Sequence, residues 1–303
     1  MAANPTIFNT SFNTCLDLPH CRWLKIYGEC TSDEPVISVD WRDELLENKE
    51  TGNIHGGVIT TLVDMASACT LAAQFERFES IATLDMRIDY LKQPVPGQAI
   101  HARAHCYKTE GQIAYIRSHC YQEDETKPFA LGMATFVHRL ISLSELQVTL
   151  KQLKNERSEL KRATINHDAE LKRRAYDLMP YSKAINLKIG TDSENRRIYC
   201  LPFSQDHIGD FTQMALHGGL IGGFLQSCIN LHVMEELNLS SPARIIDYST
   251  DYLLSGRPED SYARCEIIHA GKRISQVTAT MWQSRIEKPI AFARAQIQMP
   301  VVE

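Results

Sequence analysis

The pattern of apolar and polar residues predicts one long buried helix near the start of the chain. From Val58 to Ala73 the residues are apolar on nearly every side of a helix, with Asp64 as the exception. A helix that is apolar all round is buried in a protein core. Before it, residues 36–41 alternate apolar and polar side chains. That alternation has the period of a strand with one buried face.

Four further strands are predicted after this helix. Residues 80–91, 98–107, 112–121 and 128–137 carry strand patterns, and Pro, Gly and acidic residues between them supply turns. We expect these consecutive strands to form an antiparallel meander. One long helix lying against one curled antiparallel sheet is an α+β arrangement, and this is the fold class we predict.

The stretch from 141 to 174 has a different character. Ser142 followed by Glu145 can form a capping box, and leucines recur at helical spacing among many Lys, Arg and Glu residues. This is the pattern of an amphipathic helix with one apolar stripe. We interpret it as a connecting helix whose charges form a solvated face.

After the connecting helix the first half of the sequence returns. His55 and His217 lie 162 positions apart, as do Tyr90 and Tyr252, and both histidines are followed by two glycines and an apolar helix. Self-similarity at a fixed offset is the mark of a tandem duplication. We therefore predict two similar domains that pack as an intramolecular pseudo-dimer. The predicted parts are an N-terminal domain at 1–140, the connecting helix at 141–174 and a C-terminal domain at 175–303.

Each repeat carries a His-Gly-Gly motif directly before its apolar helix. The glycines permit a sharp turn, and the first N–H groups of a helix have no partner within it, so they can bind an anion or an oxyanion. Nine residues after the His, the first repeat has Asp64 and the second has Gln226. A carboxylate in an apolar helix is costly unless it is paired or used. Asp64 is therefore a candidate catalytic residue. It is also a difference between the two repeats, because the second has Gln226 in its place.

Composition narrows the classes of protein to consider. With 303 residues, 44% hydrophobic, 23% charged and a formal net charge of −5, the chain is typical of a soluble globular protein of about two domains, and nothing suggests a nucleic-acid surface. The nine cysteines are scattered without metal-ligand spacing, so we expect reduced thiols and no metal site. No apolar run reaches the ~20 residues of a membrane span, and no export signal opens the chain. These features favour a cytoplasmic protein.

The motif residues resemble those of a known family. The run from His55 to Asp64 (HGGVITTLVD), followed by the strand from Thr83 to Tyr90, is similar to the hotdog-fold acyl-CoA thioesterases of the phenylacetate-pathway type. The resemblance covers both repeats and leaves out only the connecting helix. It implies two tandem hotdog units, each a long helix wrapped by a curved antiparallel sheet, with active sites between the paired units. It also implies an acyl-CoA substrate and no cofactor.

The resemblance also implies roles for individual residues. In that family one unit supplies the backbone N–H of the glycine after the His, which polarises the thioester carbonyl. By position these donors are Gly56 and Gly218. The other unit supplies an acid that acts as general base or nucleophile, here Asp64, and a strand hydroxyl, here Thr83. Further residues expected near the substrate are His55, His217, Gly219, Asn48, Gln226, Lys272 and Arg273.

Some of these residues have a second interpretation. His55 and His217 either touch the substrate or only hold their loops. Asn48 lies one residue further from the His than the carbonyl-orienting Asn of the family. Lys272 and Arg273 either meet the phosphates of coenzyme A or form an ordinary solvated hairpin turn.

The repeats predict one competent cleft in each chain. The donor Gly218 faces Asp64 and Thr83. The donor Gly56 faces Gln226, and a glutamine cannot take a proton from water at neutral pH. Our leading hypothesis is hydrolysis of an acyl-CoA at one cleft. The alternative is a non-catalytic protein that binds or senses acyl thioesters, whereas a hydratase would need a catalytic His and an acid in an arrangement that we do not find. Two such chains could also pair as a homodimer or assemble further.

Overall fold

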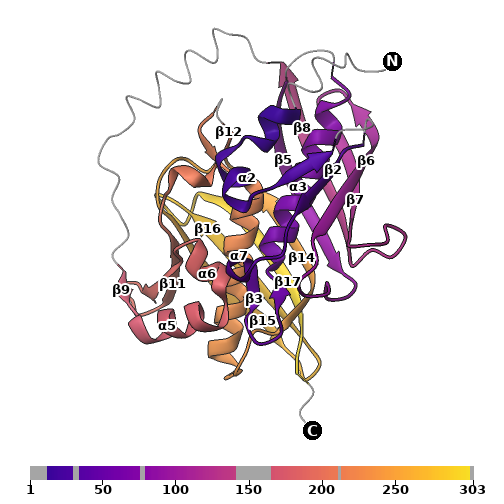
Figure 1. The fold of residues 1–303 in the computed structure, drawn as a ribbon. Coiled ribbons are helices and arrows are strands. Elements are labelled where there is room, and N and C mark those ends of the chain that lie inside the picture. Colours follow the sequence, from indigo (N-terminus) through magenta and orange to yellow (C-terminus); the bar gives the residue numbers. More distant parts are fainter. Residues whose placement is uncertain (1–11, 30–33, 76–78, 141–164, 211–212, 301–303) are drawn as a thin grey trace.

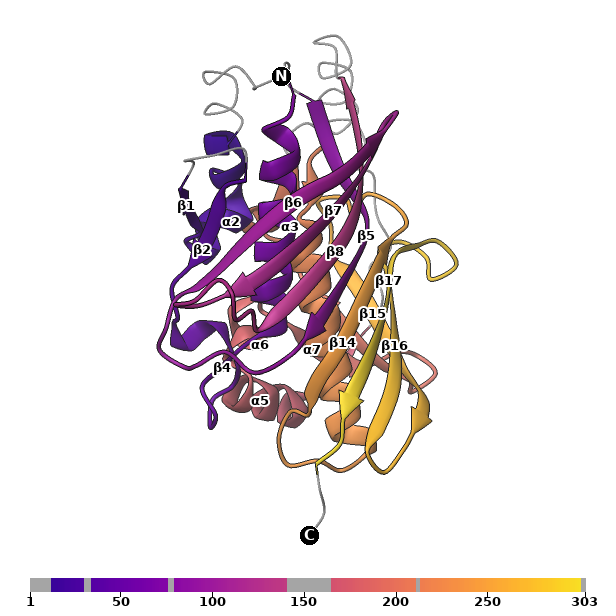
Figure 2. The ribbon, with the colours of Figure 1, turned by 90° about the vertical axis from the view of Figure 1, so that its right-hand side faces the viewer.

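The chain forms one extended antiparallel sheet with two long helices on the same side of it (Figures 1 and 2). The computed structural model describes residues 12–29, 34–75, 79–140, 165–210 and 213–300. Within these ranges no helix has the length and apolar character needed to cross a membrane. Two similar halves make up the arrangement, as the repeat predicts.

The strands of the first half lie close to where the sequence places them. They are β1 (Tyr27–Glu29), β2 (Val36–Val39), β5 (Glu79–Tyr90), β6 (Ile100–Glu110), β7 (Ile113–Tyr121) and β8 (Ala130–Leu140). Their order is β1-β2-β6-β7-β8-β5, and every pair is antiparallel. The predicted meander is confirmed for β6, β7 and β8 but is wrong for β5, which pairs with β8. The connection at 91–99 is long enough to carry the chain past the sheet, whereas 111–112 can only form a hairpin turn.

Helix α3 (Gly56–Ala72) packs against this half of the sheet. His55 precedes it, and its Nδ1 accepts a hydrogen bond from the N–H of Gly57 at 2.9 Å. Every residue of α3 is buried except Ala68, which is partly buried. Burial on all sides confirms the prediction from the apolar pattern, and each fully buried Leu, Ile or Val side chain contributes about 1.5–3 kcal/mol.

The second half repeats this plan. Its elements are β10 (Lys188–Thr191), β11 (Arg197–Leu201), α7 (Gly218–Glu236), β14 (Arg244–Tyr252), β15 (Ser261–Ala270), β16 (Ile274–Trp282) and β17 (Pro289–Gln298). Strand β14 pairs with β17, just as β5 pairs with β8. The duplicated sequence has therefore kept its strand order in both copies.

The two halves join through their sheets and through their long helices. Strand β5 pairs with β14, with Arg87 opposite Ser249, and this joins the halves in one 13-stranded sheet that has β1 at one edge and β9 (Asn166–His167) at the other. Helix α3 packs directly against α7. A Cβ on Gly219 would lie 2.5 Å from the Cα of Thr61, so the close approach of the two helices requires glycine at that position.

Short elements flank the long helices at matching places in the two halves. In the first half they are α2 (Pro19–Leu24), η1 (Asp43–Leu45), β3 (Leu46–Asn48) and β4 (Asn53–Ile54). In the second half they are α6 (Pro180–Ala184), η2 (Gln205–His207), β12 (Ile208–Asp210) and β13 (Ala215–Leu216). Both α2 and α6 have Pro in the first turn, where its missing N–H costs nothing.

The predicted connecting helix falls only partly within the described residues. Residues 141–164 lie outside them, so a helix there stays a prediction. Residues 165–174 do not continue one helix, because β9 (Asn166–His167) pairs with β10 and a separate helix, α5 (Ala169–Leu178), begins after it. Asp168 starts α5 by accepting a hydrogen bond from the N–H of Leu171 at 2.9 Å. Since α5 packs on α6 and β10, we propose that the second unit begins at β9 rather than at residue 175.

Candidate active site

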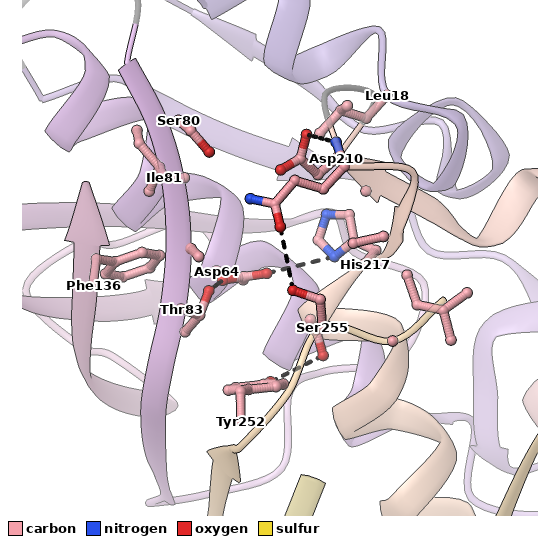
Figure 3. Close-up of a pocket in the computed structure, with 18 of the residues that line it drawn as sticks. Leu18, Asp64, Ser80, Ile81, Thr83, Phe136, Asp210, His217, Tyr252 and Ser255 are labelled. Atoms are coloured by element: carbon pink, nitrogen blue, oxygen red, sulfur yellow. Dashed lines mark hydrogen bonds and ion pairs between the residues drawn. The ribbon is translucent and has the colours of Figure 1, made fainter. Parts of the chain in front are cut away.

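A cavity of about 370 Å³ lies between the two halves, beside Asp64 (Figure 3). Its walls come from α3 and β5 of the first half, and from the start of α7 and residues 252–256 of the second. One arm is apolar and follows α3 toward its C-terminal end. That arm is lined by Met65, Ala68, Ala72, Phe75, Ile81 and Phe136. The opposite part of the cavity is more polar and is lined by Asp210, Gln213 and Ser255.

Asp64 stands on the wall of this cavity and is 6% exposed. Its Oδ1 accepts a hydrogen bond from the hydroxyl of Thr83 at 2.7 Å, and its Oδ2 accepts one from the N–H of Gly219 at 3.2 Å. Thr83 belongs to the same half as Asp64, whereas Gly219 begins the helix of the other half. The positive end of the α7 dipole also favours a negative charge here, typically by about 0.3–1 kcal/mol. The structure thus brings the acid, the strand hydroxyl and the second glycine turn together across the two halves.

A β-bulge in β5 turns Thr83 toward Asp64. The register of β5 against β8 shifts between Thr83 and Asp85. Further along β5, Met86 and Ile88 are buried in the core, and strict alternation from them would place Thr83 on the opposite face of the sheet. The extra residue of the bulge restores Thr83 to the helix-facing side. Strand β14 has the same irregularity at the corresponding place, so the bulge belongs to the repeated unit.

The two histidines of the repeated motif hold the starts of their helices. Nδ1 of His217 accepts from the N–H of Gly219 at 3.0 Å, as His55 does from Gly57. In a neutral ring this leaves the proton on Nε2. Burial lowers the pKa of both rings, that of His55 to about 3. His217 lines the cavity, with its Nδ1 at 3.5 Å from Oδ2 of Asp64, whereas His55 does not line it. The contacts of both rings support a loop-holding role.

The N–H of Gly218 points to no acceptor within the described residues. The carbonyl of Gly218 accepts a hydrogen bond from the Tyr252 hydroxyl at 2.9 Å, which fixes the start of α7. A Cβ on Gly218 would lie 3.2 Å from Oδ2 of Asp64, so the glycine and the acid are direct neighbours. The N–H of Gly219, by contrast, already binds Asp64 and His217. Gly219 therefore holds the acid rather than contacting a substrate as predicted.

The corresponding place beside Gly56 is filled by side chains. Gln226 is fully buried, with its Nε2 donating to Oγ1 of Thr60 at 2.8 Å and its Oε1 accepting from the Tyr90 hydroxyl at 3.1 Å. A Cβ on Gly56 would overlap Oε1 of Gln226, so a thioester could not reach this glycine without moving that side chain. Gly56 and Gln226 do not line the cavity. This packing gives no support to the substrate contacts predicted for Gly56 and Gln226.

Asn48 shapes its own turn rather than facing the cavity. Its Oδ1 accepts from the N–H of Glu50 at 2.8 Å and from that of Thr51 at 3.4 Å, which makes an Asx turn. The side chain is buried and does not line the cavity. Its counterpart in the second repeat, Asp210, does line it and accepts from the N–H of Gln213 at 3.3 Å. At this position of the repeat, the residue that lines the cavity is therefore Asp210 of the second half and not Asn48 of the first.

Lys272 and Arg273 lie at the far end of the sheet from the cavity. Their turn joins β15 to β16, and the pairing of both β16 and β14 with β17 places it beside Arg244, the first residue of β14. The cavity residue Tyr252 is the last residue of β14. Strand β14 advances by eight residues from Arg244 to Tyr252, which corresponds to about 26 Å. The strand register thus places Lys272 and Arg273 away from the cavity itself, and their contact with substrate phosphates stays a prediction.

Some residues that line the cavity carry no signal in the sequence. Phe75, Ile81 and Phe136 come from separate segments and read as ordinary apolar positions. Ala68 and Ala72 do carry a signal, because small residues one and two helical turns after Asp64 share its face. Within the described ranges, no Lys or Arg lines the cavity and no cluster of three metal-ligating side chains occurs.

Two family models match the chain, one in each half. The model described as the thioesterase superfamily matches residues 51–129, and the one described as the acyl-CoA thioesterase N-terminal domain matches residues 207–298. Each match contains one His-Gly-Gly motif. The chain therefore carries two thioesterase-type domains in tandem. A search of curated proteins found no match.

Solved structures show the same fold along nearly the whole chain. The tesB protein of Mycobacterium avium subsp. paratuberculosis is similar with a TM-score of 0.62 and 9% identity over 96% of this chain and 100% of that one. A protein with a hot dog fold from Alicyclobacillus acidocaldarius has a TM-score of 0.59, 9% identity and coverage of 96% and 99%. The acyl-CoA thioesterase II TesB2 of Mycobacterium marinum has a TM-score of 0.57, 8% identity and coverage of 93% and 97%. The predicted fold, a double hotdog of α+β class, is confirmed.

Proposed function

We propose that this protein hydrolyses an acyl-CoA, or a related acyl thioester, to the free acid and the thiol at one cleft per chain. One observation carries the proposal. The buried carboxylate of Asp64 lies on the wall of the cavity beside the N–H of Gly218, and it is held by Thr83 from its own half and by Gly219 from the other. The motif's resemblance to hotdog thioesterases of the phenylacetate-pathway type supports the same assignment.

In this mechanism the start of α7 activates the thioester. The carbonyl oxygen accepts a hydrogen bond from the N–H of Gly218 at the positive end of the helix dipole. Negative charge grows on that oxygen as the carbon becomes tetrahedral, and one such donor is worth about 2.7–4 kcal/mol in the transition state. The hydroxyl of Tyr252 keeps the peptide of Gly218 in place.

Asp64 acts as the general base. It takes a proton from a water molecule whose oxygen bonds to the carbonyl carbon, and the carbon–sulfur bond then breaks. The departing thiolate takes up the proton from Asp64. Each carboxylate oxygen accepts one hydrogen bond from the protein, from Thr83 or Gly219, and keeps a second acceptor site for water. A positioned base contributes about 10²–10⁴-fold to the rate.

The two arms of the cavity divide the substrate. The apolar arm along α3 holds the acyl group, and the polar part near Asp210 and Ser255 holds the thiol-bearing arm.

The eight cysteines of the described residues are all free, which supports a reducing compartment such as the cytoplasm as the place of the reaction.

Release of free thiol from a panel of acyl-CoAs tests the proposal. We expect turnover with the parent protein and a loss of about 10³-fold in Asp64→Asn. Asp85→Asn makes the same change at an exposed position on β5 outside the cavity and should behave as the parent does. A protein that binds members of the panel and releases no thiol from any of them would be the non-catalytic binder, and the hydrolase would be rejected.

A further inference from the structure

The apolar arm of the cavity ends at Glu79, whose side chain is paired with His138. Glu79 lines the cavity, and its Oε2 accepts a hydrogen bond from Nδ1 of His138 at 2.6 Å. The side chains of Glu79 and His138 are only 18% and 10% exposed. The hydrolysis proposed at Asp64 uses neither of them. A purely aliphatic acyl chain would leave this pair without a partner.

Strand register places the pair on the same wall as the reacting end of the cavity. Thr83, Ile81 and Glu79 alternate along β5 on one side of the bulge, so their side chains share one face of the sheet. Ile81 pairs directly with His138 on β8, which puts that ring on the same face. The ring of Phe75, another cavity residue, lies 4.8 Å from the ring of His138. The pair therefore closes the arm that begins at Thr83.

The length of the apolar arm can be estimated along β5 and along α3, and the two estimates agree. Four residues of β5 separate Glu79 from Thr83, which is bonded to Asp64, and they span about 13 Å. On α3 the apolar arm runs from Asp64 to Ala72, eight residues or about 12 Å. Tetrahedral carbons joined by bonds of about 1.5 Å advance about 1.3 Å each, so an extended chain of about ten carbons spans the arm.

One member of the pair can reach a ligand, because Glu79 lines the cavity and His138 does not. Nε2 of His138 is buried and has no hydrogen-bond partner among the described residues. For Oε1 of Glu79, no partner is found in the same parts of the chain. The end of the arm therefore offers one acceptor, Oε1 of Glu79, and an acceptor left unpaired away from water is unfavourable.

The charge of the cavity selects among possible partners for the free oxygen of Glu79. Three carboxylates, from Asp64, Glu79 and Asp210, line it, and no Lys or Arg does so within the described residues. A second carboxylate at the end of the acyl chain would be repelled. An ammonium would lose its hydration in an arm lined by aliphatic and aromatic side chains. A hydroxyl is neutral and can donate one hydrogen bond.

We propose that the acyl group preferred by this protein is a straight chain of about ten carbons that ends in a hydroxyl. The hydroxyl donates to the carboxylate of Glu79 while the chain fills the apolar arm. Glu79 determines the specificity, and His138 positions its carboxylate. The inference rests on the proposed hydrolysis only for where the thioester carbonyl lies.

A matched pair of substrates tests the inference: decanoyl-CoA and the same thioester with a hydroxyl on the last carbon. We expect kcat/KM to favour the hydroxylated substrate by about tenfold or more, since that substrate makes one additional hydrogen bond. Glu79→Leu should remove that preference and raise kcat/KM for decanoyl-CoA. Glu79→Gln keeps an acceptor oxygen and should keep part of the preference. Glu266→Leu, on an exposed site of β15 outside the cavity, should keep all of it.

Binding measurements separate this inference from the proposed hydrolysis. In an Asp64→Asn protein, titration calorimetry gives Kd for both thioesters without turnover. Tighter binding of the hydroxylated thioester by about tenfold, lost in Asp64→Asn/Glu79→Leu, supports the distal site even if the parent hydrolyses neither compound. Equal Kd values for the two thioesters, or a preference that survives Glu79→Leu, would overturn the inference even if the parent hydrolyses both.

Discussion

The two clefts of this chain share one backbone and differ in the side chains that occupy them. In each, a His-Gly-Gly turn begins a buried helix, and a tyrosine donates its hydroxyl to the carbonyl of the first glycine. Tyr252 does so to Gly218 at 2.9 Å, and Tyr90 does so to Gly56 at 3.3 Å. The first of these turns borders the cavity, whereas Gln226 covers the second. A shared backbone therefore does not make two equal sites.

The difference extends along the helices beyond the exchange of Asp64 for Gln226. Positions that are small around the cavity are large or polar in the second cleft: Asn230 replaces Ala68, Met234 replaces Ala72 and Glu47 replaces Gly209. Asn230 Nδ2 donates to Glu47 Oε1 at 2.9 Å, and both side chains are buried. The second cleft thus has neither an acid beside its glycine nor room for an acyl chain. Duplication allowed one cleft to stay open while the other became part of the core.

Replacing the acid should produce the largest functional effect. Asp64→Asn keeps the size of the side chain but removes the base, so we expect kcat to fall by about 10³-fold while the fold is retained. Thiol release measures the rate, and circular dichroism checks the fold. A rate close to that of the parent would mean that the open cleft does not use Asp64 as its base.

Removing the N–H of Gly218 should have the next largest effect. Proline is well tolerated at the first position of a helix, so Gly218→Pro removes the donor with little cost to α7, and we expect kcat to fall by about 10²–10³-fold. Gly218→Ala is the matched control, because it adds a Cβ and keeps the N–H. If both variants lose activity equally, crowding of Asp64 and not the hydrogen bond explains the loss.

Truncating Gln226 should affect stability far more than turnover. Gln226→Ala removes the partner of Tyr90 and Thr60 and leaves a void in the closed cleft, so we expect unfolding to become easier by about 2–4 kcal/mol. Chemical denaturation measures this change. Since Gln226 does not line the cavity, kcat should stay within a few-fold of the parent. A Gln226→Ala protein as inactive as Asp64→Asn would show that the two halves share one reaction.

The effect expected to matter least for turnover is a dependence of stability on pH in the closed cleft. Burial raises the pKa of Glu47 from 4.5 to about 7, partly offset by the hydrogen bond from Asn230. The folded state therefore holds this proton more tightly than the unfolded state. The stabilising contribution is complete below about pH 4.5 and is lost as the pH rises to about 7, a change of about 3 kcal/mol.

Glu47→Gln should remove this component of the pH dependence. Free energies of unfolding at about pH 5 and about pH 8 would differ less in the variant than in the parent, with the largest gain for the variant at the higher pH. Glu44→Gln changes an exposed neighbour and should leave the parental profile unchanged. Parallel profiles for the parent and Glu47→Gln would mean that Glu47 stays charged when folded.

Much of the fold and part of the candidate site could be predicted from the sequence. The constant offset between His55 and His217 indicated the duplication, and the apolar run around Asp64 indicated the buried helix. The resemblance to hotdog thioesterases implied the pairing of Asp64 with Gly218 across the halves. These features depend on local pattern and on repetition, and both are visible in a single chain.

The remaining features depend on register and on packing between distant segments. The bulge that turns Thr83 inward leaves no mark in the composition of β5. The distance of Lys272 and Arg273 from the cavity follows from strand pairing, which a turn motif does not specify. The Glu79–His138 pair joins residues of two strands that become neighbours only because β5 lies beside β8. Whether a cleft is open depends on several side chains together, as Ala68 and Asn230 illustrate.

The number of ligands bound by each chain tests the central claim most directly. Titration calorimetry of the Asp64→Asn protein with an acyl-CoA measures that number without turnover. One competent cleft predicts about one ligand per chain, and this binding should disappear when Ala68→Met fills the apolar arm. A stoichiometry of about two, or one ligand whose binding survives Ala68→Met, would contradict the account of one open cleft and one closed one.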